Sequence, residues 1–129
     1  MNEAGYLDGD PLMKLVQRKL YLRTVANAIL DQAIHVDGMT REQAMDLMTR
    51  TTFQEEREAA GKWVRAQLTS TQLSTYFVGF QEHWDMRKEA EQRLGPKFSL
   101  LDYNDRAISY GSPPARFVRA LMFEHAIEP

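Results

Sequence analysis

Residues 31–44 read DQAIHVDGMTREQA and contain the signals that end one helix and start the next. Gly38, three residues after His35, is a typical residue for ending a helix. Thr40 and Gln43 then have the spacing of a capping box, in which each side chain bonds the backbone N–H of the other residue. Because a short connection makes two helices pack as neighbours, the stretch predicts a helical corner with His35 close to the turn.

The rest of the chain predicts helices and no strand. The expected helices begin at Pro11, Thr40, Thr52, Thr71, Ser99 and Ser112. The first is expected to run to His35 behind an Asp10 cap, and the fourth to end at Gly95 and Pro96. In the sixth, Phe117, Val118 and Leu121 are expected to face inward. We therefore predict an all-α fold, an irregular bundle of five to six helices with two long ones, in which residues 10–124 form one domain between flexible ends at 1–9 and 125–129.

Composition narrows the class of protein. Apolar residues make up 43% of the 129-residue chain and charged residues 26%, as in ordinary globular domains. With 16 basic and 18 acidic residues, the chain has no basic surplus for nucleic acid, and it has no apolar run long enough to span a membrane. The first residues lack the blocks of a signal peptide, so the compartment is unknown and the cytoplasm is the default expectation. The absence of cysteine excludes disulfides and thiolate metal sites.

Four stretches match, in order and spacing, the motifs of one bacterial family. The matching residues are Asp31, Ile34, His35 and 40–44 (D-T-G-I-H and W-T-R-E-Q-A); Arg65, Gln72, Tyr76 and Gly79 (R-Y, P-G-Q and Y-K-I-G); EAEQRLGPKF at 89–98; and Tyr103, Asp105, Gly111 and Pro114. The family's other residues are replaced by Met39, Ala66, Ser70, Thr71 and, where it usually has histidine, Asn104. From about Pro11 to Met122, the chain resembles the C-terminal part of the family called domain of unknown function 885.

Members of that family look like zinc peptidases with an HExxH motif, which lies before the matching region. This sequence contains no HExxH, so the resemblance implies no metal ligand in this chain and zinc only in the full-length family. It implies that the chain forms the substrate-cleft portion of a peptidase-like protein and is inactive by itself, which leaves its status as an enzyme uncertain. The implied partners are a peptide substrate or a complementary catalytic half.

The resemblance gives five residues roles at a cleft. It implies that His35 contacts substrate, that Tyr76 stabilises an oxyanion, and that Arg65, Gln72 and Gly79 bind substrate. Each residue type also has a structural explanation. His35 can be held by the helix dipole and Asp31. On the residues alone Tyr76 is better explained as one more aromatic of a core stripe, and Arg65 as the partner of Glu58 or Gln72.

A second function of another class stays open. The chain could be a small helical module for protein interaction or self-association, and as such it would expose an apolar patch. An independent enzyme with a new active site is less well supported, because the sequence shows no nucleophile–base pair and no phosphate-binding loop.

Overall fold

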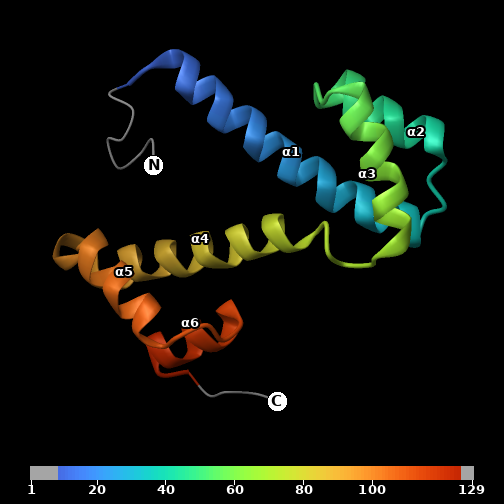
Figure 1. The fold of residues 1–129 in the computed structure, drawn as a ribbon. Coiled ribbons are helices and arrows are strands. Elements are labelled where there is room, and N and C mark those ends of the chain that lie inside the picture. Colours follow the sequence, from blue (N-terminus) through green and yellow to red (C-terminus); the bar gives the residue numbers. More distant parts are fainter. Residues whose placement is uncertain (1–8, 126–129) are drawn as a thin grey trace. The chain divides into compact units, whose positions relative to one another are not determined.

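The computed structural model describes residues 9–125, and it confirms the all-α prediction (Figure 1). The helices are α1 (Pro11–His35), α2 (Arg41–Asp46), the π-helix η2 (Leu47–Thr51), α3 (Glu56–Leu68), α4 (Thr75–Leu94), the 3-10 turn η3 (Gly95–Lys97), α5 (Leu100–Ser109) and α6 (Ala115–Phe123). The two long helices are α1, with 25 residues, and α4, with 20. Among residues 9–125 there is no strand, and none of the helices is long and apolar enough to cross a membrane.

The chain divides into two compact units, residues 1–77 and 78–129. The single domain over 10–124 stays a prediction. The predicted flexible ends fall largely on residues 1–8 and 126–129, which lie outside the described residues. Two residues of these predicted ends, Gly9 and His125, are described. Gly9 lies in a turn with φ +79°, and the His125 backbone N–H donates to the Ala120 carbonyl oxygen at 2.9 Å.

The predicted corner in the first unit is confirmed. The Thr40 N–H donates to the Gln43 side-chain oxygen at 2.9 Å, and the Gln43 N–H donates to the Thr40 hydroxyl at 3.3 Å. Gly38 has φ +68°, and the next N–H, of Met39, bonds back to the Ala33 carbonyl oxygen at 2.9 Å. The turn therefore ends α1 at His35 and lets α2 begin at Arg41.

The core of the first unit lies where α1, α2, η2 and α3 meet (Figure 1). Its buried residues are Leu30, Ala44, Met48, Ala59, Ala66 and Leu73. Three of these six are alanines at 0–1% exposure, so the helices approach closely around the larger Leu30 and Met48 side chains. This contact fixes the C-terminal half of α1, where Asp31 and His35 lie.

Two helix boundaries differ from the prediction in this unit. The helix expected to begin at Thr40 changes into the π-helix η2 after Asp46. Thr52, expected to cap the third helix, instead donates its hydroxyl to the Leu47 and Met48 carbonyl oxygens at 3.1 and 3.0 Å. Its hydroxyl therefore satisfies carbonyls at the end of η2. The next helix, α3, starts only at Glu56, and its N-cap residue Glu55 makes no side-chain capping bond.

The fourth helix begins at Thr75 rather than at Thr71, because Thr71 has φ +64° and cannot be part of an α-helix. The resembling family has glycine at this position, and the chain keeps the glycine-type backbone with a β-branched residue. Such a conformation costs about 1–2 kcal/mol for a residue with a Cβ atom.

We expect Thr71→Gly to raise the free energy of unfolding by about 1 kcal/mol, since the relieved strain exceeds the added chain entropy of glycine. Gly38→Ala is the matched control in the opposite direction. A Cβ atom at Gly38 meets no other atom within 4 Å, so its φ of +68° alone should cost about 1 kcal/mol. Urea unfolding of both variants checks the prediction, and a destabilised Thr71→Gly would contradict it.

The second unit contains most of α4, then η3, α5 and α6. Gly95, with φ +52°, ends α4, and the Ser99 hydroxyl caps α5 by accepting from the Asp102 N–H at 3.3 Å. Its core consists of Met86, Val118 and Met122. The inward residues predicted for α6 were partly wrong, because Leu121 is 42% exposed. The buried face is centred on Val118 and Met122, one helical turn apart, and Leu121 lies beside it.

Candidate functional site

His35 joins the end of α1 to the end of α3. Its Nε2 atom lies 2.9 Å from the Ala66 carbonyl oxygen and 2.9 Å from the Thr69 carbonyl oxygen. Since carbonyl oxygens only accept hydrogen bonds, Nε2 carries the hydrogen and donates to both. The bonds satisfy two carbonyls at the C-terminal end of α3. A structural role therefore accounts for this nitrogen, although its bonded partners are these two carbonyls and not Asp31, which the sequence suggested. The contact of His35 with substrate stays a prediction.

Asp31 holds the loop that precedes α4. Its carboxylate is buried, and one oxygen accepts from the Thr71 N–H at 3.1 Å. The other oxygen accepts from the Ser74 N–H at 3.1 Å and from the Ser74 hydroxyl at 2.8 Å. The His35 Nε2 atom lies 3.7 Å away. The sequence suggested only that Asp31 orients His35, whereas its main contacts are with a loop forty residues further along the chain.

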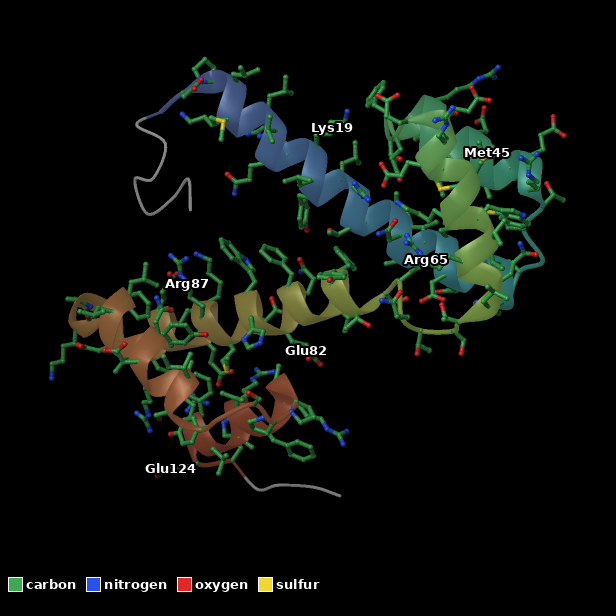
Figure 2. All side chains as sticks on the ribbon, viewed as in Figure 1. Lys19, Met45, Arg65, Glu82, Arg87 and Glu124 are labelled. Atoms are coloured by element: carbon green, nitrogen blue, oxygen red, sulfur yellow. The ribbon has the colours of Figure 1, made fainter. Side chains whose placement is uncertain are left out.

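The other predicted site residues of the first unit are on its surface. Figure 2 shows Arg65 on α3, where it is exposed, and Gln72 is exposed in the following loop. The expected pairing of Arg65 with Glu58 does not form, because the Glu58 carboxylate contacts Arg23 and, at 3.8 Å, Lys62. Tyr76 is 70% exposed, so its explanation as a core aromatic is wrong.

Gly79, the fifth predicted site residue, lies on α4 within the second unit. A Cβ atom there would meet nothing within 4 Å, so local packing does not require glycine at this position. The substrate-binding role of Gly79, like those of Arg65 and Gln72, stays a prediction.

A buried polar chain lies behind α3. The Lys62 ammonium, on a side chain that is 1% exposed, donates to the Gln54 amide oxygen, and the Gln54 amide donates to the Thr52 hydroxyl at 2.9 Å. Burial, helped by the positive charges of Arg23 and Arg65 and opposed by Glu58, lowers the pKa of Lys62 to about 8. No pattern in the sequence singles out Lys62. The chain of bonds ties α3 to the end of η2 and stays closed to solvent.

The stretch 89–98, which matches the family motif, is organised by Glu89. Its carboxylate accepts from Arg93 on the same helix and from the Arg119 Nε of α6 at 2.7 Å. Burial alone would raise the pKa of Glu89, but hydrogen bonds from Arg119 and Arg93 outweigh it and lower the pKa below its usual value. The His125 Nε2 atom lies 2.8 Å from the Arg93 guanidinium. Glu89, a residue of the matching stretch, therefore joins α4 to α6 through Arg119.

The second unit has a surface cavity of about 590 Å³, which we name the α4–α5 cavity. It is lined by Phe80, His83, Trp84 and Arg87 of α4, by Tyr103, Asn104, Ala107 and Ile108 of α5, by 111–113 of the next loop, and by Val118 of α6. Its volume is within the range of small-molecule and peptide pockets. Two residues of the resemblance, Tyr103 and Gly111, line this cavity together with Asn104, which replaces the family's usual histidine. The sequence did not suggest that these three positions meet.

Aromatic and polar groups alternate around the α4–α5 cavity. Phe80 and Trp84 stack with their ring centres 6.0 Å apart, and the Lys88 ammonium lies 4.8 Å from the centre of the Trp84 ring. Glu91 holds both Lys88 and Arg87 in place, each at 2.8 Å. The arrangement offers an apolar wall with a positive edge, which can receive an apolar side chain and a nearby carbonyl or carboxylate group.

Tyr103 forms the inner wall of the same cavity. Its hydroxyl donates to the His83 carbonyl oxygen at 3.4 Å and so joins α5 to α4. Burial raises the pKa of this phenol above its usual value, and the positive charge of Arg87 partly opposes that rise. Tyr103 therefore stays protonated at neutral pH and serves as a hydrogen-bond donor rather than as a base.

The residues present do not fit a zinc site. Over residues 9–125, no group of three histidine, cysteine, aspartate or glutamate side chains is placed to hold a metal ion. Asp31 and His35, which lie close together, are already bound to backbone groups. No chemical step through a metal is therefore assigned to the described residues.

Comparison with known proteins places the chain in a family. The family model for a bacterial protein of unknown function, DUF885, matches residues 1–122. A solved structure of a candidate lipoprotein of unknown function from Shewanella oneidensis is similar with a TM-score of 0.93 and 45% identity, over 95% of this chain and 22% of that one. This chain thus spans about a fifth of the length of that protein. The search of curated proteins found no match to this chain. The chain belongs to the family of bacterial proteins of unknown function designated DUF885.

Proposed function

We propose that this chain is the peptide-binding portion of a larger, zinc-peptidase-like protein, and that the α4–α5 cavity receives an apolar side chain of the peptide. The observation that carries the proposal is that two residues of the family resemblance, Tyr103 and Gly111, line this cavity, together with Asn104, which stands where the family usually has histidine. The peptidase relationship itself comes from the resemblance of the sequence motifs. The similarity of this chain to about a fifth of a longer protein supports the proposal that it is one portion of a larger protein.

The groups around the cavity suit a peptide better than a charged cofactor. Phe80, Trp84 and Ile108 provide apolar contact area, and Asn104 offers both a donor and an acceptor to a peptide backbone. The positive charge beside Trp84 favours a carboxylate at the edge. In this proposal the chain binds and orients a peptide, while the bond-breaking groups belong to other parts of the larger protein. The oxyanion role of Tyr76 remains part of that proposal, supported by the exposed position of its ring.

We expect Ile108→Ser to weaken binding of the peptide Ala-Ala-Phe-Ala-Ala about tenfold, because the variant removes apolar contact from the cavity wall. Leu101→Ser is the matched control. Both side chains lie exposed on α5, Leu101 at 68% and Ile108 at 74%, but only Ile108 lines the cavity. Isothermal titration at fixed salt concentration measures both affinities. If Leu101→Ser weakened binding as much as Ile108→Ser, the cavity would not be the peptide site.

Protein interaction is the second candidate function, and a specific observation favours it. Several apolar residues of α1 are exposed, including Leu12 at 65% and Leu15 at 63%. Such residues in a row are typical of a surface that another protein covers. This function is compatible with peptide binding, because α1 and the α4–α5 cavity belong to different units.

A further inference from the structure

One side of α1 has apolar residues in both halves of the helix but is covered only in the C-terminal half. Ala26, Leu30 and Ala33, spaced by three and four residues, are buried. Leu12 lies five helical turns before Leu30, and Leu15 five turns before Ala33, so these residues point to the same side of the helix. We name Leu12, Leu15, Val16 and Leu20 the α1 stripe. These four are 65%, 63%, 43% and 56% exposed. The face that packs on other helices at one end of α1 is thus uncovered at the other.

The surroundings of the α1 stripe are positively charged. From Pro11 to Leu30 the helix contains Lys14, Arg18, Lys19 and Arg23 and no acidic residue. Lys19 projects from the exposed half of the helix in Figure 2. Arg23, at the edge of the covered half, contacts the Glu58 carboxylate of α3. In the covered half of α1, apolar residues pack against other helices and a basic residue, Arg23, faces an acidic one, Glu58. The exposed half has the apolar and basic residues but no such partner among the described residues.

We propose that the α1 stripe docks against an apolar, acid-rimmed helical surface formed by a part of the larger protein that this chain does not include. The proposal rests on the proposed function, in which this chain is one portion of a longer protein. Two observations support it. The stripe continues a face that is already buried by helices, and the solved relative extends far beyond the 22% of its length that this chain matches. The basic residues on α1 require the partner surface to be acidic.

Cysteine labelling tests the proposal directly, because the chain has no cysteine of its own. Leu15→Cys places a thiol in the stripe, and Gln17→Cys, two residues on, places the control thiol on the other side of the helix. Each variant is labelled with a maleimide both in this chain and in a chimera of the Shewanella protein that carries this chain in place of its matched segment. Peptide mapping by mass spectrometry identifies the labelled position.

We expect Leu15→Cys to react about tenfold more slowly in the chimera than in the chain, with Gln17→Cys nearly unchanged, since buried thiols are poorly reactive. Equal rates for Leu15→Cys would overturn the proposal. So would protection of the chain alone that grows with its concentration, which indicates a second copy, or protection by phosphatidylglycerol vesicles, which indicates a membrane.

Cysteine at the position aligned with Leu15 in the intact Shewanella protein provides the same readout if the chimera does not fold. None of these outcomes changes the expected effect of Ile108→Ser on peptide binding, so the two proposals fail separately.

Discussion

Asp31→Ala is expected to lower the free energy of unfolding by about 3 kcal/mol, a large effect for a single substitution. The Asp31 carboxylate is buried and accepts three hydrogen bonds, from the Thr71 N–H and from the N–H and hydroxyl of Ser74. Bonds to a charged acceptor contribute more than neutral ones, and their loss leaves two backbone donors without this partner. The loop before α4 should then lose its fixed conformation.

A surface aspartate provides the control for this prediction. Asp46 is paired with Arg50 one turn further on, with side chains that are 54% and 84% exposed. Asp46→Ala should therefore cost no more than about 0.5 kcal/mol. Urea unfolding followed by circular dichroism measures both variants, and hydrogen exchange at the 71 and 74 amides locates the change. Equal stability of Asp31→Ala and Asp46→Ala would show that the loop does not depend on the carboxylate.

The second large effect concerns pH and Lys62. Burial lowers the pKa of Lys62 to about 8 in the folded chain, against 10.5 for the ordinary group. Between these values the unfolded chain holds a proton that the folded chain has released, so stability rises with pH. From pH 7 to pH 9.5 the gain is about 2 kcal/mol, with a slope that approaches 1.36 kcal/mol per pH unit above pH 8. Well below pH 8 both states are protonated and the contribution is constant.

Lys62→Met should remove this gain, so that the free energy of unfolding of the parent chain rises by about 2 kcal/mol relative to that of the variant from pH 7 to pH 9.5. The charged groups around Lys62 are Arg23, Glu58 and Arg65. Lys97→Met, at an exposed position of η3, is the matched control and should keep the pH profile of the parent chain. A Lys62→Met profile parallel to the parent would contradict the prediction.

Local signals in the sequence predicted the helical corner well. The capping box at Thr40 and Gln43, the turn at Gly38 and the Asp10 cap with Pro11 all depend on residues within a few positions of each other. Such signals specify local backbone conformation directly. For the same reason the C-terminal ends of the two longest helices, at His35 and just before Gly95, were predicted correctly, although the start of α4 was not.

The signals failed where a residue has two possible partners. Thr52 and Glu55 have the spacing of a capping pair, but the Thr52 hydroxyl bonds the carbonyls before it rather than the N–H groups after it. Tyr76 follows the helical spacing of a core stripe, yet whether such a face is buried depends on which segment covers it. Neither choice can be read from neighbouring residues.

The candidate site could not be predicted at all from local patterns. The α4–α5 cavity brings together residues near positions 80–87, 103–108 and 111–118, and only the packing of α4, α5 and α6 makes them neighbours. The resemblance singled out Tyr103 and Gly111 as matches and Asn104 as a departure, but only as separate positions along the chain. Likewise, the partner of Asp31 lies forty residues away in sequence, so its role as a loop anchor became evident only in the structure.

The measurement that tests the central claim most directly is a titration of the nitrogen-15-labelled chain with Ala-Ala-Phe-Ala-Ala, followed by two-dimensional NMR. If the α4–α5 cavity binds peptide, the amide signals that shift will be those of residues 80–87, 103–108 and 111–113, together with the Trp84 indole and the Asn104 side-chain amide. Shifts confined to other residues, or no shift at millimolar peptide, would contradict the claim that this portion of the protein is a peptide-binding site.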